Sequence, residues 1–140
     1  MQSKEKNNLI FIRLFKDEDI NEKLVEACEK HNVKMGIVLS AIGQVKQVQL
    51  GYFKAKGNYA GETFNENLEI LSLSGNIIKQ KGEHLLHIHG VFGGEKKNAI
   101  GGHLIKGTVG VMAEIVILKT KIDAFRELDE ETGLKLLNLE

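Results

Sequence analysis

From residue 35 onward, the chain is a series of short apolar runs separated by glycine-containing breaks, and this pattern constrains the fold more than any other feature. The sequence has no proline, so its turns must be built from its 15 glycines together with asparagine and aspartate. Short apolar runs bounded by such residues predict β-strands. We expect strands in MGIVLSAIG, QVKQVQLGYF, NLEILSLSG, HLLHIHGVFGG, AIGGHLIKG and VGVMAEIVILK, and turns at Gly43, AKGNYAG, SGN and GGEKKN.

The first 32 residues have a different texture. Residues 1–7 are polar and are expected to be frayed, which leaves residues 8–140 as a single domain. The stretch NLIFIRLF predicts a strand with Ile10, Ile12 and Leu14 on one face. The stretch DEDINEKLVEACEKHN predicts a helix that begins with a capping box. One early helix followed by many strands predicts an α+β domain built on a mostly antiparallel, twisted sheet.

The bulk composition limits the classes of partner that we expect for the chain. The 19 basic residues are balanced by 19 acidic ones, so the chain has no overall cationic excess of the kind that drives non-specific nucleic-acid binding. No apolar run approaches the roughly 18 residues that span a bilayer, and MQSKEKNN lacks the apolar core of a signal peptide. We therefore expect a cytoplasmic protein with no membrane partner. Cys28, the single cysteine, falls on the apolar side of the predicted helix and is expected to be a small core residue.

Two histidines lie in one predicted strand, LLHIHG. Residues two apart on a strand project to the same face, so His87 and His89 should point the same way. Leu86, Ile88 and Phe92 should then face the core. His84 has the other parity and is a weaker candidate for a site.

A third histidine, His103, follows in the next predicted strand. If GGEKKNA closes a hairpin centred near Lys96, His89 faces His103 with Cβ atoms about 4.5–5.5 Å apart. Three neutral imidazoles without a thiolate are typical of an open zinc site, in which water takes the remaining position and can be activated for hydrolysis or hydration. A plain solvated sheet face with incidental histidines fits the spacing equally well.

Three charged residues interrupt apolar runs: Arg13, Glu69 and Glu114. A half-buried carboxylate usually needs a charged or hydrogen-bonding partner, so a structural pair between Arg13 and one of the glutamates is the simpler interpretation. The functional alternative makes Glu114 or Glu69 a general base or a carboxylate that orients a ligand histidine.

Several motifs together resemble one known family. They are IRLFKDEDI, SAIGQVKQVQLGYF, LEILSLSGNI, LHIHGVF, GGHLIKGTVGVMAEIVI and DEETGLKLL, of which LHIHGVF followed by GGHLIKGTVG is the specific part. Over nearly its whole length the chain resembles the PPC domain, a family shared by plants and prokaryotes, in its prokaryotic single-domain form.

The resemblance implies a compact α+β fold that associates as a homotrimer. It also implies a metal site, with zinc or a similar divalent ion held by His87, His89 and His103. In plants the same domain follows AT-hooks, short DNA-binding segments with an Arg-Gly-Arg core, and carries a Gly-Arg-Phe-Glu-Ile-Leu motif for partner contacts. This chain has no Arg-Gly-Arg segment, and its matching stretch, Glu66–Leu71, keeps only the last three residues of the plant motif.

Three functions of different classes follow. The first is a homotrimeric metal-binding protein that binds a small molecule or carries out metal-dependent chemistry on one; whether it is an enzyme stays open. The second is a DNA-associated regulator without an AT-hook, which would present lysines to phosphate: Lys79, Lys81, Lys96 and Lys97. The third is a structural trimer whose histidines are incidental. We favour the first.

Overall fold

Two long strands, β3 (Met35–Ala55) and β7 (Ala99–Thr120), run through the whole molecule and pair with each other antiparallel. The computed structural model describes all 140 residues, Met1–Glu140. Each long strand comprises two of the strands predicted from the sequence. The predicted turn at Gly43 was therefore wrong: Gly43 lies inside β3, next to a register shift, with a φ of +133° that favours glycine.

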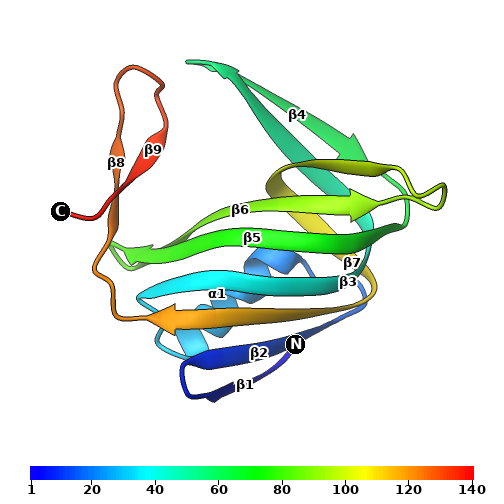
Figure 1. The fold of residues 1–140 in the computed structure, drawn as a ribbon, viewed down its shortest axis with the longest axis horizontal. Helices are drawn as coiled ribbons and strands as arrows, with labels where there is room; N and C mark the ends of the chain where they lie inside the picture. Colours follow the sequence, from blue (N-terminus) through cyan, green and yellow to red (C-terminus); the bar gives the residue numbers. More distant parts are fainter.

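The remaining strands extend this pair in a single antiparallel sheet (Figure 1). They are β1 (Gln2–Lys6), β2 (Leu9–Phe15), β4 (Asn58–Phe64), β5 (Leu68–Gln80) and β6 (Glu83–Gly93). The sheet order is β1-β2-β7-β6-β5-β3-β4, and the additional pairing of β7 with β3 closes strands β3, β5, β6 and β7 into a ring. The prediction of a mostly antiparallel α+β domain is confirmed in this broad form.

Two expectations for the sheet edges differ from the structure. Residues 1–7 were expected to be frayed, but Gln2–Lys6 form β1. This polar segment can form a strand because its backbone hydrogen bonds to β2 need no apolar side chains. Lys30 Nζ also donates a hydrogen bond to the Ser3 carbonyl at 3.2 Å. The stretch AKGNYAG was expected to be a turn, but the turn is confined to its start and β4 begins at Asn58. The predicted turn at SGN was also wrong, because these residues lie inside β5.

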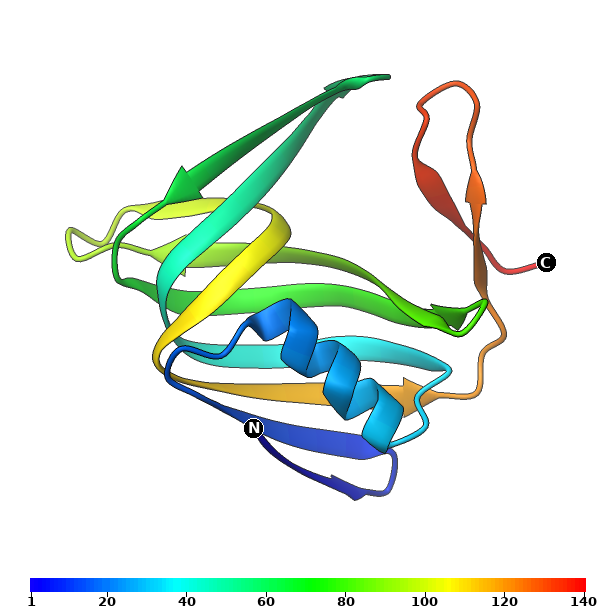
Figure 2. The same cartoon turned by 180° about the vertical axis from the view of Figure 1, so that it is seen from behind.

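The helix α1 (Ile20–Lys30) covers one face of the sheet (Figure 2). The predicted cap is present, since Asp19 Oδ1 accepts a hydrogen bond from the Glu22 N–H at 3.0 Å. The helix buries Ile20, Leu24, Ala27 and Cys28. Burial raises the pKa of the Cys28 thiol to about 12, so Cys28 is the inert core residue that its position predicted.

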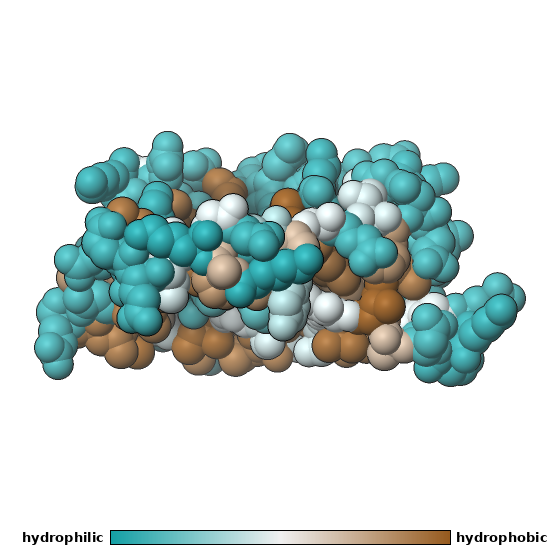
Figure 3. Space-filling model, turned by 90° about the horizontal axis from the view of Figure 1, so that it is seen from above, coloured by the Kyte–Doolittle hydropathy of each residue, from teal (hydrophilic) through white to brown (hydrophobic).

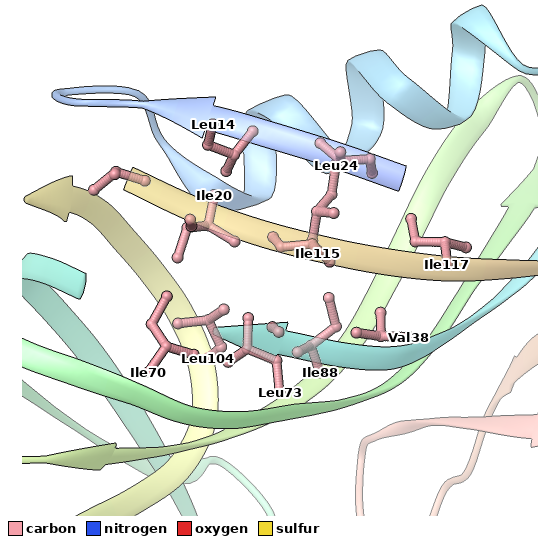
Figure 4. Packing of buried hydrophobic residues seen from close by; sticks show 14 of the residues in the cluster. Leu14, Ile20, Leu24, Val38, Ile70, Leu73, Ile88, Leu104, Ile115 and Ile117 are labelled. Carbon is pink, nitrogen blue, oxygen red and sulfur yellow. The ribbon is translucent and has the colours of Figure 1, made fainter. Parts of the chain in front are cut away.

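The core lies between α1 and the inner face of the sheet. Figure 4 shows Leu14 and Leu24 packed over Ile115, with Leu73 and Ile88 on the facing strands. As predicted, alternate residues of β2 point inward, and Ile10, Ile12 and Leu14 are at most 2% exposed. Their neighbours on the outer face, such as Phe11, remain exposed.

The last strands, β8 (Phe125–Leu128) and β9 (Lys135–Asn138), form a separate two-stranded hairpin. The predicted acidic turn joins them, and Asp129 Oδ2 accepts hydrogen bonds from the backbone and hydroxyl of Thr132. The hairpin attaches to the end of β5: the Arg126 N–H donates to Gln80 Oε1 at 2.7 Å, and Gln80 Nε2 donates to the Arg126 carbonyl at 3.1 Å. At 11 residues, α1 is too short for a bilayer, and no helix of the protein qualifies as a membrane span.

Candidate metal centre

The three predicted histidines come together on two adjacent strands. His87 and His89 lie on β6 and His103 lies on β7. The predicted hairpin register is confirmed: His89 is paired with His103, Val91 with Gly101 and Gly93 with Ala99. On the opposite side of β6, Ile88 and Phe92 are 1% and 0% exposed. The alternation of β6 therefore places the imidazoles outside the core, as predicted.

The imidazole nitrogens are close enough to share one ion. One ring nitrogen from each histidine lies within 4.8 Å of the others. The Nε2 atoms of His87 and His89 are 3.3 Å apart. Bond lengths of 2.0–2.1 Å and tetrahedral angles put two nitrogens of a zinc site about 3.3 Å apart, so this pair already has the required spacing.

The environment of His87 and His103 favours their neutral form. Burial lowers the pKa of His87, and the positive charge of Arg126 lowers it further. Burial also lowers the pKa of His103, with smaller effects from His87 and His89. A metal binds the neutral imidazole, so these shifts favour a ligand role at neutral pH. The residues present therefore fit a divalent ion such as zinc, with His87, His89 and His103 as the candidate ligands.

Tyr59 of β4 packs against the cluster. Its ring meets His103 edge-on, with centroids 6.0 Å apart and an interplanar angle of 87°. Gly51 of β3, which is paired with His103, makes room for this ring: a Cβ at Gly51 would lie 2.2 Å from Tyr59 Cε1. The small residue at position 51 thus allows Tyr59 to lie against His103.

A second glycine allows close backbone contact beside His87. Gly75 of β5 is paired with Ile88 of β6 and has a φ of +151°. A Cβ at Gly75 would lie 2.0 Å from the His87 carbonyl oxygen. No other residue type fits there without moving β5 away from β6.

Arg126 of the C-terminal hairpin reaches the same region. Its Nη2 donates to Asn76 Oδ1 at 2.6 Å and its Nη1 donates to the Lys135 carbonyl at 3.0 Å. Asn76 is paired with His87 across β5 and β6, so the guanidinium lies beside the histidine cluster. Burial lowers the pKa of Arg126, although a guanidinium stays charged at neutral pH.

The cluster lies in a broad pocket of about 1180 Å³. Strands β3 and β4 rise on one side of it and the β8–β9 hairpin on the other (Figure 1). The walls are largely apolar and include Phe53, Leu85, Leu86, Ile105, Leu136 and Leu137. This arrangement can hold a metal ion and leaves room beside it for a small molecule.

The other predicted site residues lie elsewhere. Glu114 lies opposite Arg13 in the register of β2 and β7, without an ion pair between them, and lines a separate cavity on the outer face of the sheet. Arg13 instead stacks over the Phe15 ring at 5.2 Å. Glu69 is exposed and accepts a hydrogen bond from Gln44 Nε2 at 2.9 Å. Neither glutamate lines the histidine pocket, so the structure brings no acidic side chain to the candidate metal centre.

His84 is also outside the cluster. It is 8% exposed, and its Nε2–H donates to the Val33 carbonyl at 2.9 Å, because a carbonyl can only accept.

Tyr59 and Arg126 were not predicted from the sequence as neighbours of the site. Tyr59 was placed in a turn, and nothing in the sequence shows which part of the sheet the C-terminal hairpin meets.

The four lysines of the DNA hypothesis lie at both ends of β6. Lys81 and Lys97 occupy turns, with φ values of 52° and 67°, and Lys79 and Lys96 lie next to them. Since β6 has 11 residues, the two turns are separated by about 35 Å. On a single chain these four lysines therefore form two separate small basic sites.

The fold and the site together define a class of small α+β protein. It has an antiparallel sheet, one covering helix and a three-histidine cluster in an open pocket. Residues 1–121 match the Plants and Prokaryotes Conserved (PCC) domain, the family called PPC above. The chain belongs to this family, as its motifs predicted.

Solved structures agree with this assignment. A metal-containing protein from Archaeoglobus fulgidus is 31% identical, with a TM-score of 0.83 over 94% of each chain. A protein from Bacteroides thetaiotaomicron with a suggested DNA-binding role has a TM-score of 0.92 at 24% identity, over 99% of this chain and 96% of that one. A Pyrococcus horikoshii PPC protein has a TM-score of 0.79 at 23% identity, over 96% of this chain and 94% of that one. The last two similarities show the fold alone.

Curated relatives match over part of their length. The bifunctional protein GlmU of Synechococcus sp. strain JA-2-3B'a(2-13) is 30% identical over 131 residues, which cover 92% of this chain and 20% of that protein. The GlmU of strain JA-3-3Ab matches to the same extent. This chain thus spans about a fifth of the length of the curated relatives it matches.

Proposed function

We propose that the protein is a homotrimeric metal-binding protein that holds zinc or a similar divalent ion through His87, His89 and His103. The observation that carries the proposal is the convergence of three imidazole nitrogens within 4.8 Å at the wall of an open pocket. Three protein ligands leave a coordination position for water or a small molecule, as in catalytic zinc sites. The metal content of the Archaeoglobus fulgidus relative supports the same assignment.

Self-association is supported by an uncovered apolar surface. The helix covers only one face of the sheet, and the other face exposes Phe11, Phe15 and Ile42 by 60%, 38% and 54%. Figure 3 shows apolar residues gathered along one long side of the molecule. Apolar surface of this kind on a small domain marks an interaction site. The family resemblance supplies the number of copies, three.

Metal analysis of protein purified without an affinity tag tests the site. We expect about one zinc per wild-type chain, and His89→Ala should lose it, because two imidazoles bind zinc far more weakly than three. His31→Asn is the control, since His31 lies at the end of α1 beside Ser3 and Glu5. Wild-type protein with less than about a tenth of an ion per chain and no uptake of added zinc would refute the assignment.

Oligomeric mass is measured on the same samples by light scattering. The homotrimer should have three times the 15.6 kDa mass of the chain. The DNA-associated alternative has weaker support, because the basic turns are separated on each chain. Retention of duplex DNA with a steep salt dependence would favour it over the metal-binding function.

A further inference from the structure

The histidine pocket contains positive charge without a negative counterpart. Its lining includes Arg126 and Lys135 but no aspartate or glutamate. Arg126 takes part in none of the ion pairs of the protein. A partly buried charge is costly unless a partner of opposite sign compensates it. The pocket is therefore electrostatically incomplete in a way that an anion would correct.

The guanidinium of Arg126 is fixed in place and still has free donors. It donates to two neutral oxygens, Asn76 Oδ1 at 2.6 Å and the Lys135 carbonyl at 3.0 Å. A guanidinium has five N–H groups in a planar fork, so donors remain for a ligand. Because neither acceptor carries a charge, the positive charge is positioned without being neutralised. Such a preorganised fork suits the two oxygens of a carboxylate.

The position of the fork relates it to the candidate metal centre. Asn76, which accepts from Arg126, is paired with His87. Arg126, His87 and His103 also line the same pocket, so the guanidinium lies close to the cluster. Apolar side chains from β6 and from the C-terminal hairpin complete the walls: Leu85, Leu86, Leu136 and Leu137. A ligand with an anionic end and an apolar body matches all of these surfaces.

We propose that the pocket binds a small organic carboxylate, with its carboxylate recognised by Arg126 beside the histidine cluster and its apolar part packed on the leucines. This inference rests on the proposed function for the metal and adds the class of ligand. It assigns a binding role to Arg126, which lies outside residues 1–121, the part that matches the family.

Matched ligands test the charge. Hexanoate and hexanol have the same number of carbon atoms and differ in the anionic group, so calorimetry on zinc-loaded wild-type protein should give a Kd for hexanoate at least about tenfold lower. Arg126→Gln should remove this preference, and Arg126→Lys should keep part of it. Arg13→Gln is the control, because Arg13 is the only other arginine and lines the outer cavity. Inorganic phosphate is the comparison for an anion without an apolar body and should bind more weakly than hexanoate.

The ratio of the hexanoate and hexanol dissociation constants distinguishes loss of the Arg126 charge from detachment of the C-terminal hairpin. If Arg126→Gln merely detached the hairpin, hexanoate and hexanol would both bind more weakly and the wild-type ratio would persist, which would overturn the inference. Equal binding of hexanoate and hexanol to the wild type would overturn it as well. Phosphate binding as tightly as hexanoate would overturn the choice of an organic acid.

The zinc measurement separates this inference from the function on which it rests. Arg126→Gln should still bind about one zinc per chain, because Arg126 is not a ligand. Full zinc content without a hexanoate preference refutes the carboxylate site alone. Absence of zinc together with a hexanoate preference that Arg126→Gln removes refutes the metal function and retains the carboxylate site.

Discussion

His89 of β6 lies directly opposite His103 of β7, and their rings stand at 85° with centroids 5.5 Å apart. The facing strands therefore hold the candidate ligands in position before any ion binds. A preformed site on a folded chain links metal binding to stability, because an ion that binds only the native state shifts the folding equilibrium.

Added zinc should accordingly stabilise the protein. At a free zinc concentration of 100 times Kd, the free energy of unfolding should rise by about 2.7 kcal/mol. Thermal unfolding of metal-free protein, with and without zinc, measures this as an increase in Tm. His103→Gln should show little increase, whereas His31→Asn should respond like the wild type. An equal increase in His103→Gln would place the ion elsewhere.

Acid should weaken both the metal-free fold and the metal site. The pKa values of His87 and His103 are lowered in the folded state by burial, so the unfolded chain takes up protons first as the pH falls. Stability is then full above the ordinary histidine pKa of about 6.5 and decreases below it. The Tm of metal-free wild type should fall more between pH 7.5 and 5 than that of a His87→Gln, His103→Gln double variant. Identical pH profiles would contradict this linkage.

Gly51→Ala should disturb the site with little effect on the fold. The new Cβ would lie 2.2 Å from Tyr59 Cε1, and Tyr59 is 45% exposed, so its ring can move outward. We expect a stability loss below about 1 kcal/mol. Zinc affinity should fall about tenfold, as for other residues that orient a ligand. Tyr59→Ala should have the same effect on affinity, while Tyr59→Phe keeps the edge contact with His103. Zinc titration with a competing chelator measures all three variants.

Gly75→Ala should damage the fold itself. Its Cβ would collide with the His87 carbonyl, a backbone atom that cannot rotate away, and its φ of +151° disfavours alanine. We expect a loss of more than about 3 kcal/mol in the free energy of unfolding, measured by chemical denaturation. Gly57→Ala is the matched control: Gly57 also has a positive φ, +71°, but nothing lies within 4 Å of its Cβ position. Its cost should be about 1–2 kcal/mol. Equal losses would show that φ alone sets the penalty.

Phe11→Glu should dissociate the proposed trimer. Phe11 is 60% exposed on the uncovered face of the sheet, and a buried carboxylate at a subunit interface would be strongly unfavourable. Light scattering should report monomers at micromolar concentration. Leu139→Glu, at an equally exposed apolar residue near the C-terminus, should leave the mass unchanged. A trimer that persists in Phe11→Glu would require a different contact surface.

The sequence was most informative where periodicity and register act together. Alternation in β6 separated the core residues Ile88 and Phe92 from the histidines, and the hairpin centred near Lys96 fixed the pairing of His89 with His103. The limits of elements were harder to predict. Gly43 was taken for a turn because a glycine inside a bulged strand has the same sequence signature as a glycine in a turn.

Contacts between distant segments could not be predicted from local patterns. The pairing of Arg126 with Asn76 and the packing of Tyr59 on His103 depend on how whole hairpins are placed. The functional alternative, a link from Glu69 or Glu114 to the histidines, required their strands to bring the carboxylates to the same face as the imidazoles. Strand pairing instead places Glu114 opposite Arg13 and Glu69 opposite Gly93. Opposed residues share a face of the sheet, so these two glutamates lie on other surfaces than the histidines.

The C-terminal hairpin supplies a wall of the histidine pocket but no residue to the buried core, which ends at Ile117 in sequence. Substitutions in β8, β9 and their turn can therefore change the shape and charge of the pocket without changing the buried core. The ligand preference of such a protein can diverge through its last 20 or so residues while the histidines and the sheet that holds them stay constant. Among related proteins, we expect tails of different length and charge to accompany different small molecules beside the same three-histidine cluster.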